Sequence, residues 1–500
     1  MKRFYHILVG LALVSAVGCS CSKAETDEDN SAPFVKVNIS EQYVNNKSGS
    51  FEVYVQSNTS WKVESKVDWI TVSTAEGSGN RNITIKYEDN FADDAEETYG
   101  ENRQGTVRIT AEGTMPATIT VKQGLQTFKN PVFMPMPDPY IWREETANGA
   151  VYYPCKSGGR SVNLGKTNKL TDWGGTSVVW NCPEFNEFDL DNTWNSSNLW
   201  APELHRIDGV WYVYYAAGWP SDYSKKNGHG DYGTQRTGVL RNTNEDPTTG
   251  IWEDMGQIFT GDADDLEQYK ADGNKATTLA NDYAIDMTPF KLDGKLYAIW
   301  SGNDENGKQR LYIAPMVNPY TIETARVLLA SPEYAWEKET SDLLEGPAML
   351  FNPDKTKLFC VYSCCQSTTY AYKLGWLELD LTNSSANDPL NPANWKKSPQ
   401  PVFSRCDNFS KNNNPNYEDA KNESTMSFGG VNGVGHNTFT KSPDGTEDWI
   451  VYHTKRYVES GWDNRDAFIQ KFTWNEEGYP VFGTPVGWQE PLEVPSGEPL

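Results

Sequence analysis

Hydrophobic and polar residues alternate in short stretches throughout residues 34–124. Alternate side chains of a β-strand face opposite sides of its sheet, so this pattern predicts strands, and no helical period interrupts it. Glycine-containing turns separate the clearest stretches, which are Phe51–Val55, Ile83–Ile85, Val107–Ile109 and Ala117–Val121. Roughly seven strands in so short a segment predict an Ig-like β-sandwich.

A longer unit repeats after residue 130, in which a turn leads into an aromatic-rich strand. Its five copies are Gly149–Tyr153, Asp208–Tyr215, Asp293–Trp300, Pro353–Tyr362 and Pro443–Tyr452. The spacing suits one four-stranded sheet for each copy, and no amphipathic helix of useful length lies between them. The chain is therefore predicted to be all-β, with an N-terminal Ig-like β-sandwich followed by a five-bladed β-propeller.

A polar residue in an apolar or proline-flanked context precedes each of these strands. The five residues are Asp138, Glu203, Asp286, Glu345 and His436. The inner strands of a propeller line its central axis, so we expect these side chains to converge at one end of the channel. Four carboxylates and an imidazole in one place are costly unless a function or a bound ion compensates for their burial.

The N-terminal segment has the features of an export sequence. Lys2 and Arg3 precede the apolar run Ile7–Val17, which is too short to span a bilayer. Ala16–Cys19 resembles a bacterial lipoprotein processing site, and the acidic residues after it resemble the surface-export signal of Bacteroidetes lipoproteins. We expect a lipoprotein signal peptide at 1–18 and an acidic tether at 19–33. Lipid on Cys19 would be the membrane attachment, at the outer membrane and facing the cell surface, with a periplasmic orientation left open.

Charge and aromatic content restrict the partners. Acidic residues outnumber basic ones by 68 to 44, a formal net charge of −24, which repels phosphate backbones, so we expect no nucleic-acid partner. The 18 Trp and 26 Tyr suit sheet packing and stacking on sugar rings. Beyond Cys19 and Cys21, six cysteines follow without a zinc-type spacing, and the sequence selects none of their fifteen pairings: Cys155, Cys182, Cys360, Cys364, Cys365 and Cys406.

Convergent acids beside aromatic residues suit the cleavage of glycosidic bonds. One carboxyl group stays protonated and donates its proton to the leaving oxygen, while another is ionised and activates water or attacks. Crowding of like charges separates the pKa values of the two groups.

Two known families resemble parts of the chain. Residues 34–125 resemble a BACON domain in the order Ser60–Val63, Asp68–Ile70 and Val121–Gly124. That family is credited with carbohydrate or mucin association and often serves as a spacer. We interpret Trp61 and Trp69 as core residues rather than ligand platforms, because so small a sandwich needs large core side chains.

The second resemblance covers about residues 130–490 of a domain expected at 126–500, which is identified as a member of glycoside hydrolase family 43. Its landmarks are Asp138–Pro139, Trp200–Glu203, Asp286, Glu345–Pro347 and Gly435–Asn437. The resemblance implies an inverting mechanism with Asp138 as general base, Glu345 as general acid and Asp286 as the residue that orients Glu345 and tunes its pKa.

The resemblance also implies binding residues. Trp200, His436 and Arg456, or Lys455 beside it, would contact substrate, and His436 would lie near a structural Ca²⁺ or a water cluster. No cofactor is required. Glu203 is interpreted as a structural acid beside the pocket, and no partner is assigned to the remaining histidines, His205, His229 and His453.

The segments around these residues look most like exo-acting α-L-arabinofuranosidases. We expect removal of terminal α-L-arabinofuranosyl residues from arabinan, arabinoxylan or related oligosaccharides. β-Xylosidase, exo-galactanase and endo-arabinanase of the same family remain alternatives, as does a non-catalytic carbohydrate-binding propeller.

Overall fold

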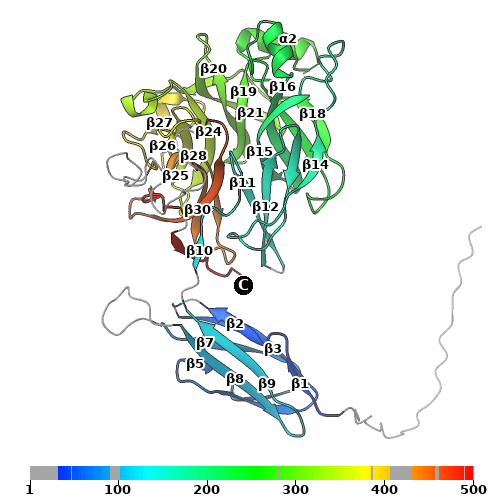
Figure 1. Ribbon diagram of the computed structural model, residues 1–500, viewed down its shortest axis with the longest axis vertical. Helices are drawn as coiled ribbons and strands as arrows, with labels where there is room; N and C mark the ends of the chain where they lie inside the picture. The colour runs from blue at the N-terminus through cyan, green and yellow to red at the C-terminus, as the bar shows by residue number, and fades with distance from the viewer. Residues whose placement is uncertain are drawn as a thin grey trace, which may run out of the picture. The chain divides into compact units, whose positions relative to one another are not determined.

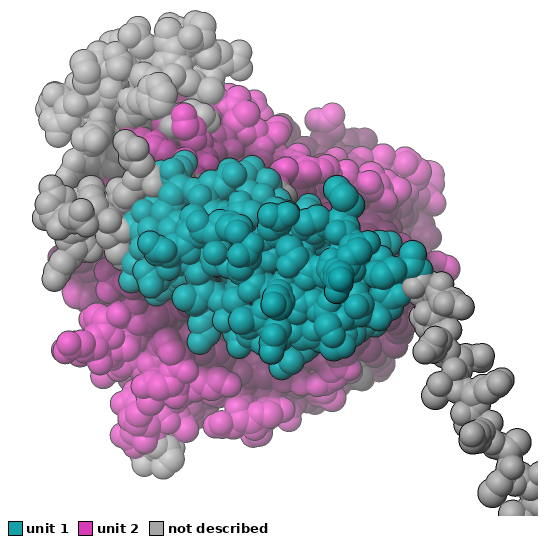
Figure 2. Space-filling model, turned by 90° about the horizontal axis from the view of Figure 1, so that it is seen from below, with its two compact units in different colours: residues 1–124 teal, residues 125–500 magenta. Residues whose placement is uncertain are grey.

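The protein is described by a computed structural model that covers residues 32–44, 46, 48–90, 102–124, 127–147, 149–273, 275–278, 281–383, 387–405, 431–456, 461–488 and 490–498. The chain forms two compact units, residues 1–124 and residues 125–500 (Figure 2). The proposed signal peptide, Cys19, Cys21 and Cys406 lie outside the described residues.

The first unit is a sandwich of two sheets. One has the order β1-β3-β7-β5 and the other β2-β9-β8-β4-β6. Valine and isoleucine side chains from both sheets fill the core around Trp61, which is 2% exposed, whereas Trp69 is partly buried against it. The interpretation of both tryptophans as packing residues is therefore confirmed. The strands are β1 Val35–Val37, β2 Glu41–Val44, β3 Gly49–Ser57, β4 Ser60–Ser65, β5 Ile70–Val72, β6 Glu76–Ser78, β7 Arg81–Tyr87, β8 Arg103–Ala111 and β9 Ala117–Gln123.

The second unit contains five antiparallel sheets, each built from strands consecutive in the chain. Blade 1 is β11 Tyr140–Thr146, β12 Gly149–Ser157, β13 Ser161–Leu164 and β14 Ser177–Asn181; blade 2 is β15 Ser197–Ile207, β16 Val210–Gly218, β17 Arg236–Asn242 and β18 Glu253–Gln257. Blade 3 is β19 Ala284–Leu292, β20 Lys295–Asn303, β21 Gln309–Asn318, β22 Thr321–Ile322 and β23 Val327–Ala330. Blade 4 is β24 Leu344–Phe351, β25 Lys357–Cys364, β26 Lys373–Asp380 and β27 Trp395–Lys397; blade 5 is β28 Asn432–Lys441, β29 Asp448–Lys455, β30 Arg465–Trp474 and β31 Pro480–Val481.

These sheets form the predicted five-bladed propeller. The first strands β11, β15, β19, β24 and β28 lie towards its middle, and last strands such as β14, β18 and β27 lie at its periphery (Figure 1). The aromatic-rich strands of the repeat are the second strands of the five blades. A small sheet pairs β10 Thr127–Lys129 with β32 Pro491–Glu493 and so joins the two ends of this unit.

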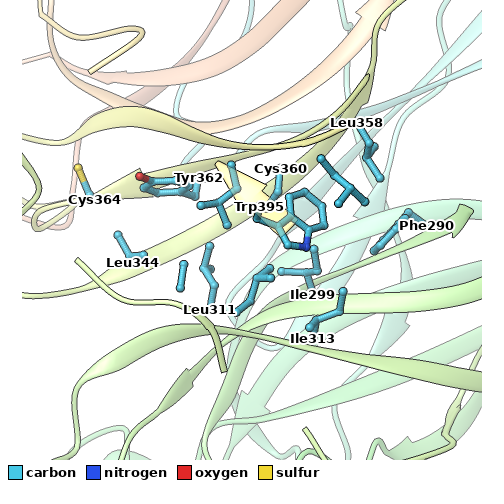
Figure 3. Packing of buried hydrophobic residues seen from close by; sticks show 14 of the residues in the cluster. Phe290, Ile299, Leu311, Ile313, Leu344, Leu358, Cys360, Tyr362, Cys364 and Trp395 are labelled. Carbon is cyan, nitrogen blue, oxygen red and sulfur yellow. The ribbon is translucent and has the colours of Figure 1, made fainter. Parts of the chain in front are cut away.

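Aliphatic and aromatic side chains hold neighbouring blades together. Between blades 3 and 4, Ile299 and Ile313 face Leu358 and Cys360, with the Trp395 ring among them (Figure 3). Burying surfaces of this kind is the dominant favourable contribution to folding, so the inner strands are held firmly around the axis.

Helices are short among the described residues. They are α1 Ser221–Lys226 and α2 Ala263–Ala271, with 3₁₀ turns at Ala335–Lys338 and Pro392–Asn394. No helix in the described ranges has the length and apolar character needed to cross a membrane. The five described cysteines are buried free thiols: Cys155, Cys182, Cys360, Cys364 and Cys365.

Candidate active site

The first strand of every blade has a left-handed residue near its start. In blades 2 to 5, pairing with the second strand is interrupted at this residue, as in a β-bulge. A bulge bends the strand and redirects a side chain, which here brings polar groups to one end of the axis. The left-handed residues are Asp138, Ala201, Asp286, Gly346 and His436, with φ between 40° and 55°.

A cavity of about 430 Å³ lies at this end of the propeller. It brings together five of the residues predicted from the sequence, which are Asp138, Trp200, Asp286, Glu345 and His436. Its lining also includes residues that were not predicted, among them Arg465.

Asp138 lies among three basic side chains. Its Oδ1 is 2.8 Å from Arg465 Nη1, 3.3 Å from His436 Nδ1 and 3.5 Å from His453 Nδ1. Burial alone would raise the pKa of Asp138, but the charge of Arg465 holds it well below its usual range. Asp138 is therefore ionised near neutral pH.

His453 contacts both the carboxylate and the backbone of Asp138. The backbone N–H of Asp138 donates to Nδ1 of His453 at 3.2 Å, so Nδ1 is an acceptor and the ring is neutral. Burial lowers the pKa of His453 to about 3, consistent with that state. Tyr372 stacks on the ring at 5.4 Å. The interpretation that His453 has no partner is wrong.

Glu345 has the opposite electrostatic environment. Burial raises its pKa to about 7, and the negative charge of Asp138 adds to the shift, while the Tyr372 hydroxyl and Gln309 oppose it. Gln309 Nε2 donates to Glu345 Oε2 at 3.2 Å. A carboxyl group with this pKa retains a proton that it can donate near neutral pH.

Asp286 is hydrogen-bonded to Gly346, the residue that follows Glu345. Its Oδ2 accepts the backbone N–H of Gly346 at 3.0 Å, which holds the chain next to the Glu345 side chain. Burial raises the pKa of Asp286 well above its usual value, and the charges of Glu345 and Asp138 raise it further. A Cβ atom at Gly346 would lie 3.2 Å from His436 Nδ1, so this close packing requires glycine, which also has a φ of +54°.

His436 and Trp200 complete the walls. The backbone N–H of His436 donates to Ser363 Oγ at 2.8 Å, and burial lowers the pKa of the His436 imidazole. Trp200 is half-buried and meets Tyr232 edge-on at 4.9 Å. Both residues are placed where a bound molecule would contact them.

Arg456 does not lie where the sequence analysis expected it. It is not among the described residues that line the cavity, because its Nε and Nη2 bind the buried carboxylate of Asp466 at 2.9 and 2.7 Å. Lys455 is buried and bonds to the Gly461 carbonyl. Arg465, on β30, occupies the place expected for Arg456. The sequence places one arginine directly after β29 and another at the start of β30, and only the structure of the turn between these strands decides which of them reaches the cavity.

Glu203 is not among the residues that line this cavity, although its charge contributes to the raised pKa of Asp286. The left-handed position of its strand is Ala201, and Glu203 instead lines a second cavity of about 640 Å³ formed by later residues of the inner strands. Its Oε2 is 2.8 Å from His205 Nε2, and His205 Nδ1 is 3.4 Å from the Tyr140 hydroxyl. His205 therefore has partners, contrary to expectation. His229 only packs edge-on against Trp219.

The described residues contain no group of three or more His, Cys, Asp or Glu side chains arranged to hold a metal ion. A calcium ion near His436 stays a prediction, and no step below depends on it.

Comparison with known proteins confirms both family resemblances. The sequence profile of Glycosyl hydrolases family 43 matches residues 128–480, and that of the Viral BACON domain matches residues 35–126. Extracellular exo-α-(1→5)-L-arabinofuranosidases of Streptomyces avermitilis and Streptomyces chartreusis are 33% and 29% identical over 297 and 341 residues. The alignments cover 58% and 66% of this chain, respectively. The chain spans about half the length of the first relative and 84% of the length of the second.

A solved structure is similar in both sequence and fold. The crystal structure of α-L-arabinofuranosidase from Lactobacillus brevis is 30% identical, with a TM-score of 0.57. The match covers 73% of this chain and 98% of that one.

Replacing Glu345 by Gln is expected to stabilise the folded protein near neutral pH. The unfolded carboxyl group loses its proton near pH 4.5, whereas the folded one keeps it up to about pH 7, so ionisation favours the unfolded state between these values. Relative to Glu345→Gln, the free energy of unfolding of the wild type should fall by at most ~1.4 kcal/mol per pH unit in this window.

Chemical denaturation at several pH values measures this difference. Glu305→Gln, at an exposed position, controls for the loss of a carboxyl group. A gap between wild type and Glu345→Gln that does not change with pH would contradict the raised pKa.

Proposed function

Because the chain belongs to glycosyl hydrolases family 43, we propose that residues 126–500 remove terminal α-L-arabinofuranosyl residues from plant polysaccharides or oligosaccharides with inversion of configuration. One observation carries the mechanism: a single cavity holds one carboxyl group whose pKa is lowered and another whose pKa is raised. Inverting glycoside hydrolysis requires a base and an acid in these two protonation states.

The reaction needs only protein side chains and water. Asp138 takes a proton from water, and the hydroxide oxygen forms a bond to the anomeric carbon. The bond from that carbon to the leaving oxygen breaks, and Glu345 donates its proton to this oxygen. Arg465 keeps Asp138 ionised beforehand, and Asp286 holds the backbone next to Glu345.

Two observations support the choice of sugar. The relatives described above are named as exo-α-(1→5)-L-arabinofuranosidases and an α-L-arabinofuranosidase. The cavity has aromatic walls and buried acids at its floor, which suits the end of a chain better than its middle. Arabinan, arabinoxylan and their oligosaccharides are the proposed substrates.

Hydrolysis of aryl α-L-arabinofuranoside and of aryl β-D-xyloside tests this proposal. We expect arabinose release from the aryl substrate. On α-1,5-arabinobiose, whose alcohol leaving group needs protonation, we expect a loss of roughly 10²–10⁴-fold in kcat for both Asp138→Ala and Glu345→Ala, because each removes a proton-transfer group. Glu305→Gln should behave as the wild type. Xylose release would overturn the choice of sugar, and a Glu345→Ala variant with more than about a tenth of the activity on arabinobiose would refute its role as the acid.

We further propose that lipid on Cys19 attaches the protein to the outer membrane, facing the cell surface. Support comes from the sequence alone, through the basic and apolar residues ahead of Ala16–Cys19 and the acidic residues after it. A surface position would give the enzyme direct access to large polysaccharides.

Cys19→Ser should abolish attachment, because the thiol that accepts the lipid is lost. Fractionation of expressing cells should find the wild type and Cys21→Ser with the membranes, and Cys19→Ser outside them. Equal retention of all three proteins would count against the anchor.

A further inference from the structure

We propose that Trp462 forms a binding subsite for the sugar ring that follows the cleaved residue, the leaving-group sugar. The inference rests on the proposed function and extends it to a part of the substrate that the catalytic carboxyls do not contact. Trp462 belongs to the turn between β29 and β30 in blade 5 and lines the same cavity as the three acids.

Trp462 differs from most other tryptophans of the protein in its exposure. It is 57% exposed, whereas Trp173, Trp211, Trp300 and Trp449 are each at most 2% exposed. The acids lie deeper, since Asp286 is 6% exposed. Trp462 therefore lies at the mouth of the cavity, where a chain whose terminal residue fills the floor has to pass.

Two hydrogen bonds hold the backbone at Gly461 and Trp462. Arg465 Nε donates to the Trp462 carbonyl at 3.2 Å, and Nη1 of the same guanidinium binds Asp138 at 2.8 Å. The buried Lys455 ammonium bonds to the carbonyl of Gly461. One arginine thus fixes the position of Trp462 relative to the catalytic base.

An exposed indole on a backbone held in this way is suited to bind a ring, because aromatic faces stack on the apolar C–H face of sugars. Tyr232 also lines the cavity; it is 40% exposed and packs against Trp200. The cavity lining therefore includes two exposed aromatic side chains, Trp462 and Tyr232.

Trp462 belongs to blade 5, which lies between the blades of the two catalytic carboxyl groups. First strand β28 of blade 5 packs against β11, which follows Asp138, and against β24, which bears Glu345, the group that protonates the leaving oxygen. A sugar attached to that oxygen extends outwards from the cavity floor, towards the rim where Trp462 lies.

The Trp462→Ala variant tests whether the indole contacts the leaving-group sugar or the cleaved sugar. We expect about 10-fold lower kcat/KM on α-1,5-arabinobiose or arabinosyl-xylobiose, and less than about 2-fold change on methyl α-L-arabinofuranoside, whose leaving group has no ring. Aryl glycosides are avoided because their own ring could stack. Loss on only one of these two oligosaccharides identifies the main chain that the subsite prefers.

Three controls accompany this variant. Trp462→Phe keeps an aromatic face and should lose less, and Phe188→Ala removes an aromatic side chain that is 92% exposed outside the cavity and should lose nothing. The backbone carbonyl at 462 remains in every variant, so the Arg465–Asp138 pair is preserved. Unchanged melting temperatures would establish that the fold is intact.

Equal losses of kcat/KM in Trp462→Ala on the methyl glycoside and on the oligosaccharides would overturn the proposal, since Trp462 would then contact the cleaved sugar. An unchanged kcat/KM on all of these substrates would also overturn it. Failure of the wild type on all these substrates would refute the proposed function instead. Calorimetric titration of arabinobiose and arabinosyl-xylobiose into Glu345→Gln then still tests the subsite. Trp462→Ala in that background should raise Kd about 10-fold for at least one of them, and unchanged binding would contradict the inference.

Discussion

Three carboxyl groups share one largely buried cavity, and they cannot all be charged there. Burial disfavours the ionised form of each, and each negative charge raises the pKa of its neighbours. Arg465 resolves this competition, because its guanidinium lies against Asp138 and holds the pKa of that carboxyl group well below its usual range. The negative charge then present on Asp138 helps to keep Glu345 protonated. A single ion pair thus assigns the base and the acid.

The propeller makes this arrangement possible by bringing five separate parts of the chain to one axis. A left-handed residue near the start of each first strand places a side chain or a backbone N–H at the same level of the channel. Where the residue is Asp or His, a functional group enters the cavity; where it is Gly346, the N–H binds Asp286. Packing between blades keeps these positions fixed, so little reorganisation is needed for reaction.

Much of this organisation could be predicted from the sequence, because local patterns determine it. Alternation and turns identified the sandwich and the second strand of each blade, and the polar residue before each strand identified Asp138, Asp286, Glu345 and His436. Glu203 was less well described: its spacing resembled that of the others, but a bulge centred on Ala201 directs it to a different cavity. A shift of two residues is not visible in the sequence pattern.

The residues that long-range contacts bring in could not be predicted. His453 and Arg465 reach Asp138 from more than 300 residues away in the chain. Choosing Arg465 over Arg456 requires knowledge of how the turn after β29 is held, which depends on the buried Lys455 and on Asp466. The ion pair with Arg465, rather than residue type, also decides which carboxyl group keeps its proton.

Infrared difference spectroscopy near pH 6 tests the central claim, that Glu345 is protonated while Asp138 is ionised in the same cavity. The carbonyl stretch assigned to protonated Glu345 should be lost when Glu345 is replaced by Gln, leaving that of Asp286, whose pKa is also raised, and the Glu345 band should persist when Asp138 is replaced by Asn. Loss of that band in Asp138→Asn, with Glu345→Gln unchanged, would reverse the assignment of acid and base and contradict the account.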